Sequence, residues 1–312
     1  MKNDTRTKAS RGQLDGSSSA GYGHAGEFLG RIWRVLPALA AICAVQVGAA
    51  VGAPPESRRE RVTKLIVKIQ RADYEGDRVA LGRLYQDLAS FADDKELGAK
   101  VRYWRGFAMW RRAINGFNDS VAPSELEHDL KRALSEFQAA ITKDPAFADA
   151  KAATGSAMGL LSFLYRNNPE LAPEFNDPVC LREFLNKALS YQKEAEAAEP
   201  ENPRVLWVLG QTRWAIPPQI GGGQDKAIET YHKGLKAARE RKAAVRDQLT
   251  PSWGEPELLM NLAWSNLNRS TPDLAAAEQY ARSALALVPH WHYVRDILLP
   301  QIEAAKGPEK KL

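Results

Sequence analysis

The chain has 312 residues, of which 44% are hydrophobic and 26% are charged, and its formal net charge is +5. These proportions are those of an ordinary globular protein, so they exclude a wholly disordered chain and a collagen-like one. The first 53 residues carry six basic and three acidic residues, which leaves 37 basic and 35 acidic residues in the remainder. Such a small excess does not indicate a nucleic-acid-binding protein, which would need a clustered basic face.

The N-terminal region has the layout of an export signal. Residues 1–34 form a basic leader rich in Gly, Ser and Ala, and we expect it to be disordered. Arg31 and Arg34 precede an apolar run over residues 35–53 that ends in small residues, which is typical of a secretory signal peptide. We therefore predict an exported, periplasmic protein. Because the run approaches the roughly 20 residues that span a bilayer, an uncleaved membrane anchor is the alternative.

The cysteine content agrees with this division of the chain. Cys43 lies inside the apolar run, so a cleaved protein would keep only Cys180. No internal disulfide framework is then possible.

The next region predicts a pair of helices over residues 59–72 and 77–91, with a turn at residues 74–76. Its apolar side chains recur at helical spacing, at Val62, Leu65, Ile66 and Ile69.

A repeated pattern follows along the rest of the chain. It consists of a small residue, a second position four residues later, a small residue three later and a proline five later. It occurs in the segments 133–145, 188–200 and 277–289, and a fourth copy from Ala227 lacks the proline. Ten residues after two of these prolines stand Gly155 and Gly210, each inside a new apolar segment of helical period.

This pattern resembles the tetratricopeptide repeat family, whose unit is a helix–turn–helix of about 34 residues. The resemblance covers roughly residues 60–305. It implies an all-α fold, an irregular superhelix of stacked helix pairs over residues 57–305. Insertions at residues 115–127, 167–180 and 217–223 interrupt the repeats, so we expect uneven stacking.

The insertion with Pro217, Pro218 and the glycines Gly221, Gly222 and Gly223 is similar to Gly-rich insertions in exported bacterial tetratricopeptide proteins. These include proteins resembling the accessory T component of TRAP-type transporters, which implies a solute-handling role. The loop lacks the order of a phosphate-binding loop and no strand precedes it. We therefore predict a turn before a helix that begins near Asp225.

The C-terminal region predicts a capping helix over residues 294–305 and a charged tail over residues 306–312. No part of the chain after the apolar run shows sustained alternation of period two, so the predicted fold class is all-α.

A binding groove is predicted on the first helix of each repeat, which lines the concave surface in such solenoids. The groove-facing side is read from positions around the small residue of each helix, and flanking arginines are added. The predicted groove residues are Tyr103, Phe107, Trp110, Arg111, Ser156, Arg204, Trp207, Gln211, Trp214 and Trp264. Aromatic and Arg side chains are enriched at binding hot spots. The alternative is that the aromatic side chains fill space between irregular repeats.

Candidate catalytic and metal-binding patterns are weak. His292 and Asp296 share one helix face, but they lack further ligands at a chelating spacing. Cys180 begins an amphipathic helix and has no adjacent base, so a buried thiol is the favoured interpretation. We therefore expect no enzyme activity, no metal and no cofactor.

Two functions are compatible with these features. The favoured one is an exported scaffold that binds a protein or peptide partner of the cell envelope in the aromatic groove. The alternative is an accessory protein that binds a small solute, as the likeness to the T component implies. No nucleic-acid partner is expected.

Overall fold

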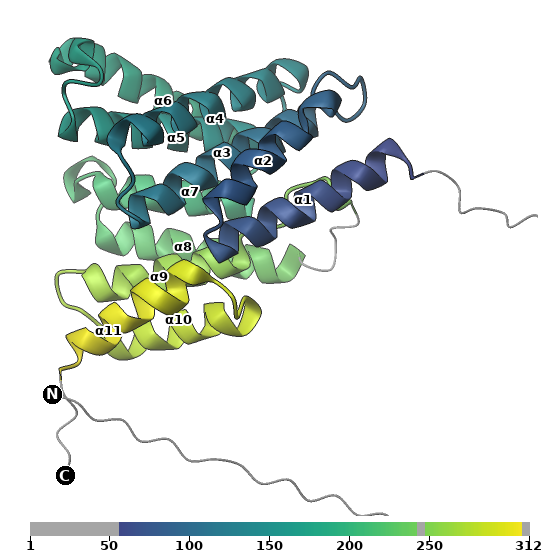
Figure 1. Cartoon of the computed structure of the whole chain (residues 1–312). Helices are drawn as coiled ribbons and strands as arrows, with labels where there is room; N and C mark the ends of the chain where they lie inside the picture. The colour runs from purple at the N-terminus through teal and green to yellow at the C-terminus, as the bar shows by residue number, and fades with distance from the viewer. Residues whose placement is uncertain (1–55, 242–246, 308–312) are drawn as a thin grey trace, which may run out of the picture. The chain divides into compact units, whose positions relative to one another are not determined.

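The computed structural model describes residues 56–241 and 247–307. The predicted leader, the apolar signal segment and most of the charged tail lie outside the described residues. Within them the chain is helical and contains no strand (Figure 1), which confirms the all-α prediction. The α-helices are α1 (Arg58–Glu75), α2 (Arg78–Asp87), α3 (Gly98–Asn118), α4 (Pro123–Lys143), α5 (Ala148–Asn167), α6 (Pro178–Ala198), α7 (Pro203–Ala215), α8 (Gln224–Arg241), α9 (Glu255–Asn268), α10 (Leu274–Leu287) and α11 (Leu299–Ala305). Short helical turns are η1 (Ala89–Phe91), η2 (Pro173–Asn176), η3 (Pro218–Ile220) and η4 (Tyr293–Leu298).

The first predicted helix pair is present as α1 and α2. Helix α1 begins with a capping box, in which Ser57 and Glu60 satisfy each other's backbone N–H groups. It ends at Gly76, whose φ of 72° is left-handed and favours glycine. The turn predicted at residues 74–76 is therefore present, with glycine at its left-handed position.

Later helices pack in four consecutive pairs, α3 with α4, α5 with α6, α7 with α8 and α9 with α10. In three of these pairs, a glycine of the first helix lies so close to a side chain of the second that a Cβ atom would collide with it. That side chain occupies the second position of the repeated sequence pattern. The contacts join Gly106 to Phe137, Gly155 to Gln192, and Gly210 to Tyr231.

The three predicted insertions are accommodated in different ways. Residues 115–127 do not form a loop, because most of them lengthen α3 and α4, and only residues 119–122 connect the two helices. Residues 167–180 contain η2 and the start of α6. The 217–223 loop contains η3 and closes on itself, since the Gly223 N–H donates to the carbonyl oxygens of Arg213 and Ile216, at 2.8 Å each.

Aromatic side chains fill the interior between α3 and α7. The rings of Tyr103, Phe107 and Trp110 are at most 1% exposed. Trp253, from the loop before α9, packs between them and Trp207, with ring centroids 5.5 Å from Phe107 and 5.4 Å from Trp207. Its indole N–H donates to the Tyr103 hydroxyl at 3.0 Å. We call this group, with Trp207 at its edge, the aromatic core.

The predicted C-terminal helix is present as η4 followed by α11, and η4 has π-helical geometry. Pro300 has no backbone N–H, so it cannot continue a regular α-helical ladder. A single π-helical turn is one way in which a helix accommodates such a gap.

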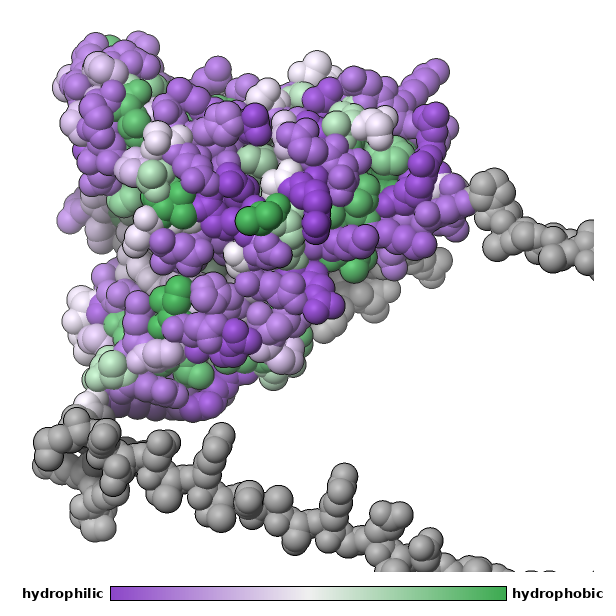
Figure 2. Space-filling view, in the orientation of Figure 1, coloured by the Kyte–Doolittle hydropathy of each residue, from purple (hydrophilic) through white to green (hydrophobic). Residues whose placement is uncertain are grey.

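Two features of the described surface bear on function. None of the described helices combines the length and apolar character that a bilayer crossing requires. The face shown in Figure 2 is mostly hydrophilic, with small hydrophobic areas among polar side chains.

Candidate functional site

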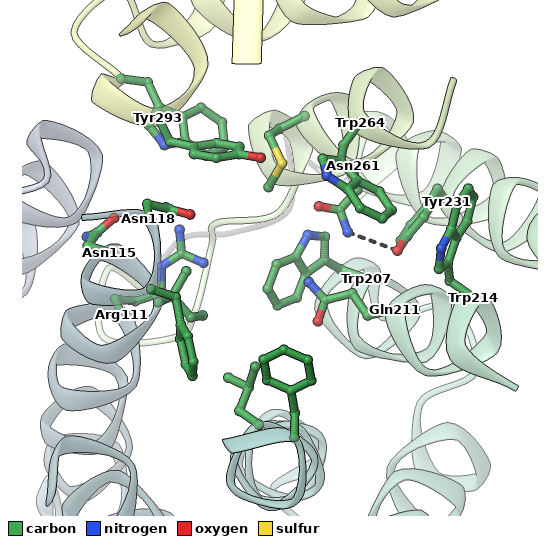
Figure 3. A pocket seen from close by; sticks show the side chains of 16 residues that line it. Arg111, Asn115, Asn118, Trp207, Gln211, Trp214, Tyr231, Asn261, Trp264 and Tyr293 are labelled. Atoms are coloured by element: carbon green, nitrogen blue, oxygen red, sulfur yellow. Dashed lines mark hydrogen bonds between the residues drawn. The ribbon is translucent and has the colours of Figure 1, made fainter. Parts of the chain in front are cut away.

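A cavity of about 420 Å³ lies among helices α3, α5, α7, α8 and α9 and the segment that leads into η4. Its wall consists of aromatic and aliphatic side chains with a few polar groups between them (Figure 3). The lining residues are Arg111, Ile114, Asn115, Phe117, Asn118, Leu160, Phe163, Trp207, Gln211, Trp214, Tyr231, Met260, Asn261, Trp264, Trp291 and Tyr293. Cavities of about 300–1,000 Å³ with this kind of lining are typical small-molecule sites.

The aromatic part of the wall combines buried and partly exposed rings. Trp207 and Trp291 are 1% and 2% exposed, and they form its deep part. Trp214 and Trp264 are partly exposed and pack edge to face, with ring centroids 5.1 Å apart. Tyr293, the first residue of η4, covers one side of the cavity (Figure 3).

Arg111 is the single charged residue among the described residues that line the cavity. Its Nε–H points at the Asp73 carboxylate of α1, at 2.8 Å from both oxygens. Asn115, one helical turn further along α3, donates to the Asp73 backbone carbonyl and carboxylate at 3.1 and 3.2 Å. Asp73 and Asn115 therefore fix the direction of the Arg111 side chain.

A second buried carboxylate stands behind this pair. Glu257 of α9 is 1% exposed, accepts the Tyr74 hydroxyl at 2.7 Å and accepts the Gly254 backbone N–H at 2.8 Å. Burial raises the pKa of Asp73 and of Glu257, while the positive charge of Arg111 acts in the opposite direction. Burial also opposes the charge of Arg111, but Asp73, with smaller contributions from Glu257 and Tyr74, outweighs it, so the pKa of the guanidinium is raised.

Several polar groups of the lining residues have no partner in the described part of the chain. They include the Nη atoms of Arg111, the side-chain amides of Asn118 and Gln211, the Oδ1 atom of Asn261 and the buried indole N–H of Trp207. Asn261 is 7% exposed, and its Nδ2 donates to the Tyr231 hydroxyl at 2.9 Å. Arg111 and Asn261 are buried, and buried polar groups are usually hydrogen-bonded, so their open atoms are candidate ligand contacts.

The structure brings five of the predicted groove residues to the cavity, namely Arg111, Trp207, Gln211, Trp214 and Trp264. On α7 and α9 the predicted helix face is the one that lines the cavity. On α3 the lining face is turned by about one residue, or ~100°. As a correction, Tyr103, Phe107 and Trp110 therefore belong to the aromatic core and do not face the cavity.

Two other predicted groove residues lie elsewhere. Ser156 is partly buried on α5 and does not line the cavity. Arg204 is buried, and its Nε and Nη2 atoms pair with Asp149 while Nη1 donates to the Trp253 carbonyl at 3.4 Å. All three nitrogens of its guanidinium therefore have protein partners.

The predicted loop glycines border a different hollow. Gly222 and Gly223, with Trp214 and Pro217, line a space of about 460 Å³ next to the first cavity, whereas Gly221 is exposed at the loop tip. Gly222 leaves no room for a side chain, because a Cβ atom there would collide with the Ile216 backbone.

The remaining candidates form no chemical centre in the described residues. His292 Nδ1 lies 2.8 Å from Asp296 Oδ2, and Nε2 lies 3.6 Å from Asp119 Oδ1. Among residues 56–241 and 247–307, no three His, Cys, Asp or Glu side chains converge as metal ligands would. Cys180 is partly buried and free.

Sequence reasoning did not identify several lining residues. Asn115 and Asn118 lie four and seven positions after Arg111, so a polar stripe on α3 was visible in the sequence. Trp291 and Tyr293 reach the cavity from the far end of the chain, which no helical period could indicate.

Comparisons with known proteins show no family. No family model matches the chain, and no curated protein matches it. It is similar to a solved structure titled "HusA haemophore from Porphyromonas gingivalis", with 18% identity and a TM-score of 0.46. That alignment covers 68% of this chain and 97% of the other. A similarity of this size carries no information about the ligand of this chain.

Proposed function

We propose that this protein binds a small organic molecule in the cavity between α3, α5, α7, α8 and α9. The observation that carries the proposal is the set of unpartnered polar groups at Arg111, Asn118, Gln211 and Asn261, held within an aromatic wall. A few oriented polar groups in a mostly apolar cavity are what small-molecule recognition needs, because they fix the orientation of the ligand.

The shape of the lining favours a compact ligand over a peptide partner. An extended peptide makes contacts in a row along an open surface, whereas these side chains converge from five helices around one volume. Large exposed hydrophobic side chains such as Val67, Val79 and Ile220 lie on three separate elements of the chain. The solute-binding alternative from the sequence is therefore the function we propose, and a protein partner is the second outcome that the experiment distinguishes.

The chemistry of the lining suits binding better than catalysis. Among the described lining residues there is no carboxylate, histidine or thiol. Burial raises the pKa of Tyr293 to about 12 and also raises that of Tyr231, so both phenols are neutral at physiological pH. No lining group is thus poised for proton transfer near neutral pH.

We further infer that the four helix pairs are divergent tetratricopeptide-like repeats and that residues 35–53 direct export. The close contacts of Gly106, Gly155 and Gly210 with the second position of the pattern support the first inference. The order of charge, apolar run and small residues supports the second. An exported binding protein of this kind would work in the periplasm.

The test is a thermal-shift and tryptophan-fluorescence screen of the purified protein against a panel of small organic molecules. Four tryptophans line the cavity, so a bound molecule should change their emission. The variant Leu160→Trp would fill the cavity and should abolish binding, whereas Val67→Trp, on the exposed side of α1, should not.

Two results would count against the proposal. If no molecule shifts the melting temperature while a peptide from envelope extract binds, the protein-partner function replaces it. If Leu160→Trp binds a hit as well as the wild type does, the cavity is not the binding site.

A further inference from the structure

The guanidinium of Arg111 has one occupied edge and one open edge. Its Nε side is occupied by Asp73, and the side chain as a whole is 3% exposed. Within the described residues neither Nη atom donates a hydrogen bond, and Figure 3 shows the guanidinium on the side of the cavity opposite Gln211 and Asn261. The open edge therefore offers two donors to a molecule in the cavity.

The positive charge of Arg111 is already compensated. Asp73 lies in direct contact with it, and Glu257 adds a second buried carboxyl group to the same cluster. Burial disfavours the charged form of both carboxyls, and it would disfavour a ligand carboxylate in the cavity for the same reason. A ligand carboxylate would add a second anion to a guanidinium that is already paired with Asp73, and burying an uncompensated charge is costly.

The opposite side of the cavity offers neutral polar groups. Asn261 binds Tyr231 with one end of its amide and leaves the other end facing the cavity. The Gln211 amide of α7 also lines the cavity and has no partner among the described residues. An amide supplies hydrogen bonds without a formal charge, so these groups suit a neutral donor or acceptor.

The rest of the wall favours a flat ring. Trp207, Trp214, Trp264 and Trp291 line one volume, and Figure 3 shows the rings of the first three with the ring of Tyr293. Aromatic rings prefer stacked or edge-to-face contacts with other aromatic rings, and these contacts add to the gain from burial.

We infer that the ligand is a neutral, flat aromatic molecule whose carbonyl-type oxygen accepts hydrogen bonds from the Nη atoms of Arg111. A second polar group of the ligand meets Gln211 and Asn261. This inference rests on the proposed function, because it names the ligand class of the same cavity. Aromatic carboxylates of the same shape bind less tightly.

The experiment compares matched pairs of probes by isothermal titration calorimetry at neutral pH. The pairs are indole-3-acetamide with indole-3-acetate, and 2-naphthamide with 2-naphthoate. Each amide should bind at least about tenfold more tightly than its carboxylate, because only the carboxylate carries a charge into the cavity.

A matched pair of variants tests the role of Arg111. Arg111→Lys keeps the charge beside Asp73 but removes the planar fork of donors, and it should weaken amide binding about tenfold. Arg204→Lys makes the same change in a buried pair away from the cavity, and it should leave amide affinity unchanged.

The outcomes separate this inference from the proposed function. Carboxylates that bind as tightly as the amides, or amide affinity unchanged in Arg111→Lys, would overturn the ligand class and leave the cavity as a binding site. If neither probe pair binds while other molecules of the panel do, the ligand class is also overturned and the cavity is kept as the binding site. Failure of every molecule tested would overturn both proposals.

Discussion

Two buried Arg–Asp pairs occupy neighbouring parts of the molecule and differ in one respect. Arg204 pairs with Asp149 beside the aromatic core, and every nitrogen of its guanidinium has a protein partner. Arg111 pairs with Asp73 at the cavity, and among residues 56–241 and 247–307 only its Nε atom has a partner. The sequence analysis predicted both arginines in one groove. In the structure Arg204 is fully paired inside the protein, whereas Arg111 has open donors at the cavity.

The difference shows how a structural pair is distinguished from a binding group. Nearly all buried donors in native proteins have a hydrogen-bond partner, so a fully partnered guanidinium such as that of Arg204 stabilises the interior. An open edge on an otherwise fixed guanidinium is oriented before the ligand arrives, which limits the entropy lost on binding. The predictions below test this distinction between the filled interior and the open cavity.

The largest effect is expected when the structural pair is broken. Arg204→Met leaves the Asp149 carboxylate buried without its cation, and the free energy of unfolding should fall by about 3–5 kcal/mol. Urea denaturation measures it. Arg71→Met is the control, because Arg71 pairs with Glu75 on an exposed face of α1 and its loss should change little. Equal effects of the two substitutions would show that Arg204 is not a structural residue.

A smaller effect is expected on α5, which carries one glycine in a close helix contact and one glycine with free space around it. A Cβ atom at Gly155 would collide with Gln192 and the Ala188 carbonyl, so Gly155→Ala should destabilise the protein by about 1–3 kcal/mol. A Cβ atom at Gly159 would meet nothing within 4 Å. Gly159→Ala should therefore stabilise the protein by about 0.5–1 kcal/mol through helix propensity.

Thermal and urea unfolding of the two alanine variants measure the contrast on one helix. A loss of stability in both would mean that α5 is tightly packed on both sides, and the open region beside Gly159 would be absent in solution.

The smallest effect concerns the second carboxyl group behind Arg111. Because burial raises the pKa of Glu257 in the folded protein above its ordinary value of 4.5, the folded state favours the protonated form. Its contribution to stability is present at low pH and is lost as the pH rises through the folded-state pKa, by at most about 1.4 kcal/mol per pH unit for one proton.

Glu257→Gln removes that dependence, since glutamine does not titrate. The wild type should therefore gain stability relative to the variant as the pH is lowered from 8 to 5, measured by urea denaturation. Parallel curves for the two proteins would show that Glu257 titrates at the same pH in the folded and unfolded states.

Much of the fold could be predicted from the sequence because it depends on local patterns. Gly76 ends α1, and the spacing around Ala133, Ala188 and Ala277 located the second helix of each of three pairs. Helix periodicity and stop signals act over a few residues, so one sequence shows them. Residues 115–127 were expected to interrupt the repeats, but most of them extend α3 and α4.

The cavity was less accessible to sequence analysis because it depends on contacts between distant segments. The predicted face of α7 lines the cavity at Trp207, Gln211 and Trp214, whereas the face of α3 was placed about one residue off. A rotation of that size separates Trp110, in the core, from Arg111, at the cavity. Asp73 orients Arg111 from another helix, and nothing local in the sequence indicates that pairing.

The meeting of Tyr74 and Trp291 has a consequence for the order in which the molecule assembles. Their ring centroids lie 5.1 Å apart although they stand 217 positions apart in the sequence. The helix pairs form through short-range contacts and can fold as they leave the ribosome, whereas contacts of such long range form late. Trp291 and Tyr293 follow all the other lining residues in the sequence, so the cavity acquires its final wall only after the helix pairs that surround it have been synthesised.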